Sequence, residues 1–199
     1  MRFFLKLFIC ALLAVAAGMT FLVMRQGDIS YTVHEWISPA RFQQHDALIR
    51  TVAAQHNVDP MLVKAVIWRE SYFDGRKYGA AGERGLMQVT EPAAREWAKD
   101  ARVENFRGEE LFDPHVNVQA GTWYLARALQ HWKKQEDPMP FALAEYNAGA
   151  SRAQRWAGSN GDEPMAATTF RNNIDFPTTR KYVDTVLARY EFYKRRGRM

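Results

Sequence analysis

The stretch DPMLVKAVIWRES, residues 59–71, decides how the rest of the chain is interpreted. Asp59 is a favoured N-cap and Pro60 suits the first helical position, so the stretch predicts a helix that begins here. Three apolar residues stand three, four and seven positions before Glu70, on the same side of this helix: Ile67, Val66 and Val63. The Glu70 carboxyl group is therefore expected to project from the apolar face of the helix.

This position predicts an unusual acidity for Glu70. A carboxyl group on an apolar face is costly to ionise, and the dipole at a helix C-terminus also disfavours negative charge. Both effects raise the pKa, as a general acid that works near neutral pH requires. The alternative is a solvated glutamate at a helix end, which is the common situation of this residue type. Motifs further along the chain decide between the two.

The composition is typical of one globular domain. With 199 residues, 47% hydrophobic and 25% charged, the chain is long enough for a single domain with its own core. Cys10 is the only cysteine, so no internal disulfide and no cysteine-based metal site can form. The five histidines show no metal-ligand spacing, and we therefore expect no metal and no cofactor. The net charge of +5 favours a polyanionic neighbour such as a cell-wall polymer, anionic lipid or nucleic acid.

The N-terminal residues are predicted to be a targeting segment. Arg2 and Lys6 precede an uncharged apolar stretch at 7–24. Small residues at 14–17 suit cleavage of a signal peptide, and the stretch is also long enough for a signal anchor in the inner membrane. The preceding charges favour export across the cytoplasmic membrane of a bacterium, to the periplasm or cell envelope. The expected organisation is a signal peptide or signal anchor at 1–25, a linker at 26–40 and one domain at 41–199.

Beyond this segment nearly every part of the chain predicts helix, and we expect a single all-α domain. Besides the helix at 59–71, the pattern of apolar residues and caps predicts helices at 40–56, 92–101, 113 to before 137, 140–146 and 178–195. The segment 73–84 is too rich in glycine for a helix and lacks the alternation of a strand. It is predicted to be a loop.

Three short clusters could carry chemistry together with Glu70, although each has an ordinary structural explanation. Residues 85–88 (GLMQ) join a glycine and two apolar residues to a glutamine amide, and also fit a loop that re-enters the core. Residues 144–149 (AEYNAG) also fit a helix C-cap. Residues 177–183 (PTTRKYV) begin a helix, where Tyr182 also fits as a core aromatic residue.

In this order and at these separations, the clusters resemble the lytic transglycosylases, specifically the soluble-transglycosylase catalytic domain of the lysozyme-like superfamily. The resemblance covers residues 42–193, essentially the whole part expected to be exported. The matching stretches are Glu70-Ser71, residues 85–88, residues 113–121, Tyr124-Leu125, residues 146–149 and residues 179–183.

The resemblance implies a fold, an activity and a set of site residues. It implies a lysozyme-like helical domain, a monomer, that cleaves the β-1,4 bond between N-acetylmuramic acid and N-acetylglucosamine in a peptidoglycan glycan strand. The product would carry a 1,6-anhydro ring on the muramic sugar, with Glu70 as the single catalytic acid and base. The residues implied to bind or orient the substrate are Ser71, Met87, Gln88, Tyr146, Asn147 and Tyr182.

Two positions depart from the pattern of this family. Many members have a serine nine residues after the catalytic glutamate, where this chain has Gly79. Many also have a glutamate where Thr178 stands. Glu83, inserted directly before Arg84 and Gly85, is expected to be a loop charge paired with Arg84; the alternative is an extra carboxylate in the substrate cleft.

Two other functions stay open on the sequence alone. A goose-type lysozyme-like muramidase of the same superfamily would let water attack and leave reducing ends. A non-catalytic module would bind peptidoglycan without using Glu70 as an acid. Nucleic-acid binding is not expected, because the chain lacks a basic-aromatic motif of a known reader and because export argues against it.

Overall fold

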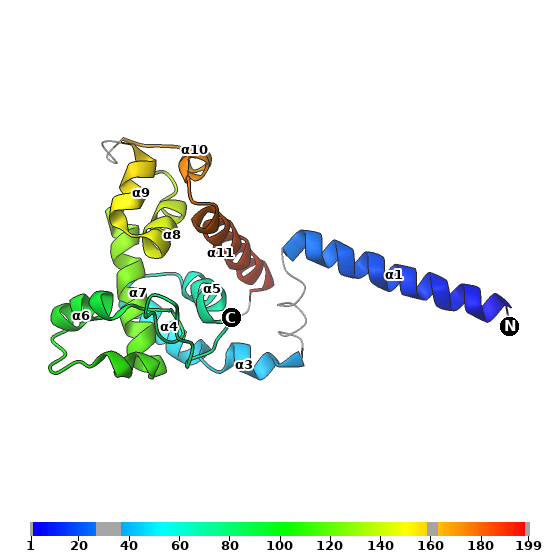
Figure 1. Cartoon of the computed structure of the whole chain (residues 1–199), viewed down its shortest axis with the longest axis horizontal. Helices are drawn as coiled ribbons and strands as arrows, with labels where there is room; N and C mark the ends of the chain where they lie inside the picture. Colours follow the sequence, from blue (N-terminus) through cyan, green and yellow to red (C-terminus); the bar gives the residue numbers. More distant parts are fainter. Residues whose placement is uncertain (1, 27–36, 159–162, 198–199) are drawn as a thin grey trace. The chain divides into compact units, whose positions relative to one another are not determined.

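A computed structural model of the chain describes residues 2–26, 37–158 and 163–197 (Figure 1). The chain divides into two units, Met1–Gln43 and Gln44–Met199. The second unit holds every residue predicted to form the site, so the fold that positions the site is the fold of this unit.

The first unit contains two described helices, α1 (Arg2–Gln26) and α3 (Pro39–Gln43). Among the described residues, no helix has the length and apolar character needed to cross a membrane. The predicted linker at 26–40 lies largely outside the described residues, which omit 27–36. The targeting segment and the domain boundaries stay predictions.

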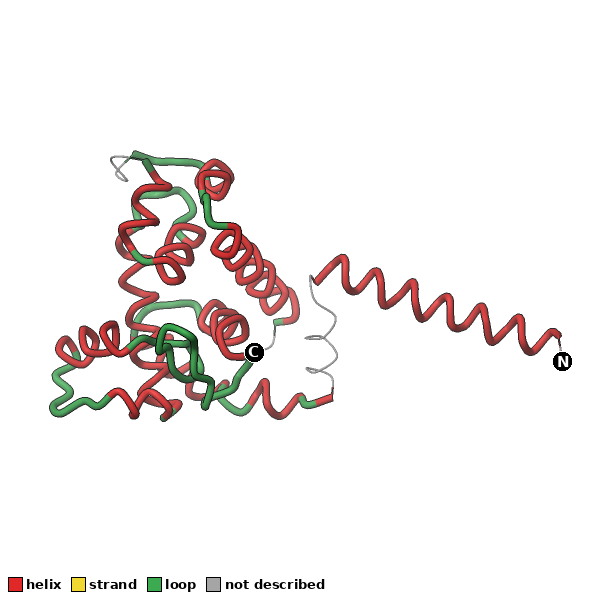
Figure 2. The backbone as a smooth tube through the Cα atoms, viewed as in Figure 1, coloured by secondary structure: helices red, strands yellow, loops and turns green. Residues whose placement is uncertain are grey.

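The second unit is built of helices joined by loops, as Figure 2 shows. Its helices are α4 (Asp46–Gln55), α5 (Pro60–Ser71), α6 (Glu91–Asp100), the short 3₁₀ helix η1 (Gly108–Phe112), α7 (Pro114–His131), α8 (Met139–Ala148), α9 (Ala150–Ala157), α10 (Ala167–Asn173) and α11 (Pro177–Arg196). Strand-type pairing in the described residues is limited to two isolated bridges, Tyr78 with Arg84 and Arg84 with Val89. The predicted all-α class is confirmed.

Helix α5 is the central element, and it begins as the sequence predicts. Asp59 caps it, accepting a hydrogen bond from the Met61 backbone N–H at 2.8 Å, and Pro60 is its first residue. Every residue of Leu62–Trp68 is buried, because α5 packs against α4 on one side and α11 on another. A helix that is covered in this way needs apolar residues on all its faces, and α5 has them.

One charged residue interrupts this apolar helix. Lys64 is only 2% exposed, and its Nζ lies 2.6 Å from Asp46 Oδ1 on α4. The same ammonium group lies 5.4 Å from the ring centre of Tyr193 on α11. A buried ammonium group requires such a partner, so the ion pair and the ring contact fix α5 against both neighbouring helices.

The helices agree with the prediction only in part. The helix expected at 40–56 is interrupted, and α4 begins only at Asp46, whose carboxylate suits a helix N-terminus and meets Lys64 there. The helix expected to run from 113 to before 137 is found as α7, which ends at His131. The short helices α9 and α10 were not predicted; both pack on α8, and tertiary contact rather than a long periodic pattern supports them.

We predict that Asp46→Ala destabilises the protein by about 3–5 kcal/mol, because it leaves the Lys64 ammonium buried without its carboxylate. Chemical denaturation of the purified chain measures this loss. The matched control is Glu96→Ala, which breaks an ion pair with Arg127 between side chains more than half exposed. The control should cost at most about 1 kcal/mol. Equal effects of the two substitutions would contradict the structural role of the buried pair.

Candidate active site

The candidate site begins at the C-terminal end of α5, where Glu70 stands in the last turn. Tyr72 and Phe73 follow with positive φ angles of 61° and 60°, so the chain leaves the helix abruptly. Lys77, in the loop beyond, donates a hydrogen bond from its Nζ to the Glu70 backbone carbonyl. The loop is therefore folded back onto the end of the helix that carries the acid.

The pKa of Glu70 is raised from its ordinary value of 4.5 to about 7. Removal of the carboxyl group from water is the largest cause, and the negative charge of Glu83 acts in the same direction. The Tyr182 hydroxyl and the positive charges of Arg69 and Lys77 oppose the shift. The side chain as a whole is half-buried, so the acid is desolvated without being sealed from a ligand. The raised pKa and the removal of the carboxyl group from water agree with the prediction, although the groups that act on the carboxyl are a tyrosine and charged side chains.

Tyr182, on α11, faces the acid from the neighbouring helix. Its hydroxyl is buried and interacts with the Glu70 carboxyl, although their mutual geometry falls short of a full hydrogen bond. Burial and the Glu70 charge raise the pKa of Tyr182 well above 10, so the phenol keeps its proton. It can therefore donate to a charged Glu70 and stabilise it, which is the direction of its effect on the pKa of Glu70.

Tyr146, on α8, approaches Glu70 from another side. Its hydroxyl donates a hydrogen bond to the Met87 carbonyl at 2.9 Å, and its ring packs edge-on against Tyr124 at 5.7 Å. Burial and the Glu70 charge raise the pKa of Tyr146 well above 10. The structure thus brings Tyr146 and Tyr182, 36 positions apart in the sequence, to the same carboxyl group.

Asn147 follows Tyr146 and joins α8 to α11. Its side chain is exposed, and its Oδ1 accepts a hydrogen bond from the Thr179 hydroxyl at 2.8 Å. Gly149, with φ 89°, is the C-cap of α8. Thr178 is exposed in the first turn of α11. The contact between the two helices near the site is made by the next residue, Thr179, and not by Thr178.

The turn that carries Met87 and Gln88 depends on Asn117, which the sequence analysis did not single out. Asn117 is fully buried in α7 and accepts a hydrogen bond from the Met87 backbone N–H at 2.7 Å. Its Nδ2 donates to the carbonyls of Arg84 and Leu111 at 2.7 and 2.8 Å. Gly85 is required here, because it has φ 74° and a Cβ would overlap the Asn117 amide. Asn117 lies within residues 113–121, one of the stretches on which the family resemblance rests.

Two of the predicted substrate-binding residues have their side chains engaged inside the domain. The Met87 side chain is 0% exposed and packs closely against Gly121 of α7. Met87 therefore contributes its backbone carbonyl to the site, through Tyr146, and not an exposed apolar surface. The Ser71 hydroxyl is buried and donates to the Ile67 carbonyl at 3.3 Å, within α5.

Gln88 is held in one orientation. Its backbone has φ 49°, and its Nε2 donates to the Lys77 and Gly85 carbonyls at 3.1 and 2.9 Å. Because both neighbours of the nitrogen are acceptors, the amide cannot be flipped without losing two hydrogen bonds. The side chain is half-buried, and its Oε1 is left to face Gly79.

The expected pairing of Glu83 with Arg84 is wrong. Arg84 Nη1 lies 3.2 Å from Glu91 Oε2, and its guanidinium group lies 5.8 Å from the ring centre of Tyr78. Glu83 instead accepts a hydrogen bond from the Ala81 backbone N–H at 3.0 Å. Consecutive residues of a turn point in different directions, and Arg84 is turned toward α6.

A second buried carboxylate near the site belongs to the framework. Glu145, adjacent to Tyr146, is 4% exposed, and its Oε2 accepts a hydrogen bond from Trp132 Nε1 at 2.8 Å. His131 Nδ1 lies 2.6 Å from the same oxygen. These two contacts on one oxygen connect Glu145 of α8 to the C-terminal end of α7, so its role is structural. Glu70 is the carboxyl group that faces the two tyrosines.

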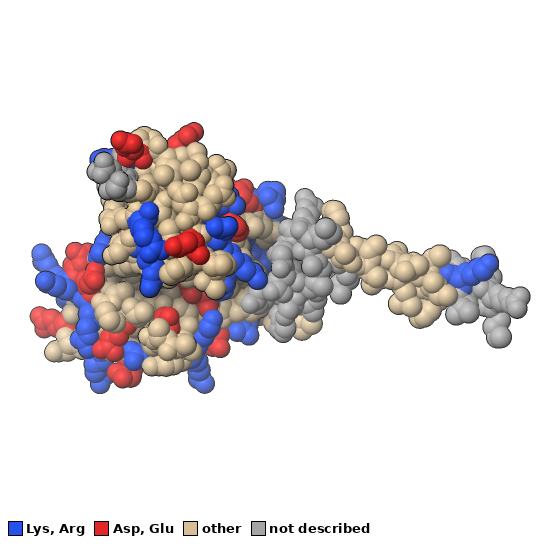
Figure 3. All heavy atoms as spheres, turned by 45° about the horizontal axis from the view of Figure 1, so that its top comes forward, with Lys and Arg blue, Asp and Glu red and all other residues tan. Residues whose placement is uncertain are grey.

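None of the candidate site residues lines the cavity found elsewhere on the domain. A cavity of about 430 Å³ lies at α7 and the C-terminal end of α4, lined by His56, Asn57, Val58, Trp123, Ala126, Arg127, Leu129 and Gln130. Among the described residues, no group of three histidine, cysteine, aspartate or glutamate side chains could hold a metal ion. Basic and acidic side chains are intermixed on the face of the domain drawn in Figure 3.

Comparison of the sequence with known proteins identifies the family that it resembles. The family model described as Transglycosylase SLT domain matches residues 47–168. The soluble lytic murein transglycosylase of Salmonella typhimurium is 32% identical over 131 residues, which are 65% of this chain and 20% of that protein. The membrane-bound lytic murein transglycosylase F of Desulfosudis oleivorans is 32% identical over 148 residues, covering 71% of this chain and 31% of that protein. The chain spans less than a third of the length of either relative.

Solved structures show the same fold. The crystal structure of the 70-kDa soluble lytic transglycosylase from Escherichia coli matches 76% of this chain and 24% of its own length, with a TM-score of 0.68 and 28% identity. The complex of a 70-kDa soluble lytic transglycosylase with bulgecin A matches 78% of this chain and 25% of its own length, with a TM-score of 0.70 and 27% identity. The helical unit described above thus has the fold of one domain of these larger proteins.

We predict that Glu70→Gln stabilises the protein at alkaline pH but not at pH 4. The folded-state pKa of about 7 lies above the unfolded value of 4.5, so ionisation of Glu70 lowers the stability of the wild type as pH rises from about 4.5 to 7. Glutamine stays neutral, and its advantage should grow to about 3 kcal/mol or less above pH 7. Urea denaturation at pH 4 and pH 8 measures it, and an advantage that is the same at both pH values would contradict the desolvation of Glu70.

Proposed function

The chain belongs to the Transglycosylase SLT domain family, as its motifs predicted, and we propose that it is a peptidoglycan lytic transglycosylase with Glu70 as its single acid and base. The proposed bond is the β-1,4 link between N-acetylmuramic acid and N-acetylglucosamine, and the proposed product is 1,6-anhydro-N-acetylmuramic acid. The observation that carries the proposal is a half-buried carboxyl group with a pKa of about 7, faced by two protonated tyrosines.

In the first step, protonated Glu70 donates its proton to the bridging oxygen. The bond from that oxygen to C1 of the muramic sugar breaks, and the N-acetylglucosamine part leaves with a free 4-hydroxyl group. Positive charge develops at C1, and the N-acetyl group of the muramic sugar stabilises it. A carboxyl group with a pKa of about 7 is half protonated at neutral pH, which suits this donation.

In the second step, the same carboxyl group acts as a base. Glu70, now ionised, takes the proton from the C6 hydroxyl of the muramic sugar, and O6 forms a bond to C1. The anhydro ring closes without water, and Glu70 is protonated again. Tyr182 assists here, because its interaction favours the charged form of the carboxyl group.

Other side chains of the site are proposed to hold the sugar. Gln88 presents an amide oxygen in a fixed orientation, and Asn147 presents an exposed amide beside Tyr146. Tyr146 itself is fixed by the Met87 carbonyl, so its ring edge is a rigid boundary of the site. Such fixed groups orient a substrate at little entropic cost.

Hydrolysis by a goose-type muramidase is the second candidate, and Glu83 is the observation that favours it. Ordinary glycoside hydrolases use two carboxyl groups, one as acid and one to activate water or attack the sugar. Glu83 is near enough to Glu70 for its charge to raise the pKa of that acid. The reaction products separate the two functions.

We predict that peptidoglycan incubated with the purified chain yields muropeptides that end in 1,6-anhydro-N-acetylmuramic acid, identified by mass spectrometry. The rate should fall as pH rises through about 7, because the acid must begin protonated. Reducing ends in place of anhydro ends would assign the chain as a hydrolase.

We predict that Glu70→Gln lowers the rate by at least about a hundredfold, because glutamine cannot transfer a proton. The matched control is Glu145→Gln, which replaces a neighbouring carboxylate that belongs to the framework. Turnover by Glu70→Gln at the wild-type rate would refute the assignment. A non-catalytic peptidoglycan-binding module would be favoured if neither the wild type nor Glu70→Gln cleaved peptidoglycan while both bound it equally well.

We also propose that the chain is exported, on the strength of Arg2 and Lys6 before the apolar residues of α1. Relatives bear the names soluble and membrane-bound lytic murein transglycosylase, so proteins of both descriptions are similar to this chain. N-terminal sequencing of the protein from a periplasmic and a membrane fraction tests the proposal. Recovery of the chain only from the cytoplasm would contradict it.

A further inference from the structure

Gly79, Glu83 and Gln88 meet at one point beside the proposed acid. A methyl group at Gly79 would overlap the Glu83 carboxylate and would lie 3.1 Å from Gln88 Oε1. The space beside the Gly79 backbone is thus filled by a carboxylate from four residues further along the chain. All three residues are half-buried, so each keeps part of its surface in contact with solvent.

The loop fixes the Glu83 carboxylate in this place. The Gly79 backbone N–H donates to the Glu83 carbonyl at 2.7 Å, and the Gly82 N–H donates to the Gly79 carbonyl at 3.1 Å. The Ala81 N–H donates to Glu83 Oε2 at 3.0 Å. Three hydrogen bonds within five residues make a closed turn, and the carboxylate is part of it.

Two hydrogen-bond acceptors therefore face the same space beside Gly79. Glu83 Oε2 accepts from the Ala81 N–H, whereas neither Glu83 Oε1 nor Gln88 Oε1 accepts a hydrogen bond from a described residue. Gln88 turns its oxygen toward Gly79 because its nitrogen is bound by the Lys77 and Gly85 carbonyls. A carboxylate and an amide oxygen that face the same space repel each other unless an N–H or O–H group lies between them. A ligand that brings such a donor gains a charge-assisted hydrogen bond.

We propose that Glu83 and Gln88 form an acceptor pair that binds an N–H or O–H group of the substrate sugar, with Glu83 placed there by the absence of a side chain at Gly79. This inference rests on the proposed function for the identity of the sugar. An acetamido sugar suits the pair, because its N–H is a donor beside a ring with further hydroxyl groups. Glu83 is then a substrate-binding residue, where the sequence analysis expected a charge paired with Arg84.

The same carboxylate acts on Glu70 through charge. Its negative charge favours the protonated form of the acid and so raises the pKa of Glu70. The groups that face the Glu70 carboxyl from the surrounding elements are Arg69 on its own helix, Lys77 and Glu83 on the loop, Tyr146 on α8 and Tyr182 on α11. Loss of the Glu83 charge should therefore lower the pKa of Glu70, which a purely structural role in the loop would not do.

Two substitutions in the full chain test the pair by different routes. Glu83→Gln keeps the size of the side chain and removes its charge. Gly79→Ala keeps the charge and displaces the carboxylate, whose flexible end can move away from the methyl group. Gly79 does not have a positive φ angle, so alanine brings no backbone strain of that kind. Because both variants act on one contact, their effects in the double variant should not add.

The readouts do not depend on turnover. One is the affinity for a tetrasaccharide of N-acetylglucosamine, measured by calorimetry; the other is the titration of the Glu70 carboxyl carbon by NMR. Each variant should weaken tetrasaccharide binding by about tenfold, as expected for loss of a hydrogen bond to a charged acceptor. Each should also move the Glu70 titration to lower pH.

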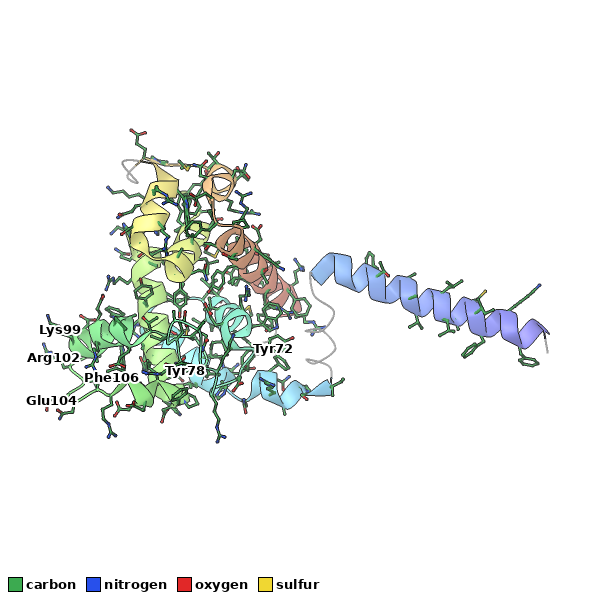
Figure 4. All side chains as sticks on the ribbon, viewed as in Figure 1. Tyr72, Tyr78, Lys99, Arg102, Glu104 and Phe106 are labelled. Atoms are coloured by element: carbon green, nitrogen blue, oxygen red, sulfur yellow. The ribbon has the colours of Figure 1, made fainter. Side chains whose placement is uncertain are left out.

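Matched controls test the loop and the overall charge. Gly75→Ala places a methyl group 4.0 Å from the Leu86 side chain, an ordinary contact elsewhere in the same loop. Glu104→Gln removes a negative charge beyond the C-terminal end of α6, away from Tyr72 and Tyr78, as Figure 4 shows. Both controls should leave the affinity and the titration unchanged.

The pair is supported only if both readouts change in Glu83→Gln and neither changes in the controls. An unchanged affinity, an unchanged titration, or no binding of the tetrasaccharide by the wild type would overturn it. Failure of the proposed function is a separate result, because it would be seen as reducing ends or no cleavage of peptidoglycan.

Discussion

The site depends on the desolvation of one carboxyl group at the end of a buried helix. Helix α5 is covered by α4 and α11, and the packing that buries Leu62–Trp68 also removes water from Glu70 in the next turn. The ion pair between Lys64 and Asp46 belongs to the same arrangement, because it holds α4 against α5. Stability and chemistry are opposed at Glu70: burial that raises its pKa also makes its ionised form costly to the fold.

The remaining parts of the site are positioned by hydrogen bonds of residues in the surrounding helices and turns. Asn117 binds two backbone groups of the turn before Gln88 and a third, the Leu111 carbonyl, in η1. Tyr146 takes its position from the Met87 carbonyl in that turn. Helix α8 is fixed in turn by Glu145, which binds Trp132. The acid thus projects from one helix while the groups around it are positioned by hydrogen bonds between others, as a preorganised site requires.

Local sequence patterns predicted much of the fold but only part of the candidate site. The cap and proline at the start of α5 predicted its first residue, and the apolar face predicted the setting of Glu70. The short helices α9 and α10 could not be predicted, because contact with α8 rather than their own sequence supports them. The role of Asn117 depends on backbone groups 6 to 33 residues away, which no local pattern shows. The pairing of Arg84 with Glu91 was missed for the same reason.

The most direct test of this account is the titration of Glu70 in the wild-type chain. The carboxyl carbon can be assigned in the NMR spectrum by its loss in Glu70→Gln, and its chemical shift can be followed from pH 3 to pH 9, an interval of about six units that spans both pKa values under comparison. The midpoint of the Glu70 titration is expected near pH 7. A midpoint near 4.5, the value of a glutamate in water, would contradict it.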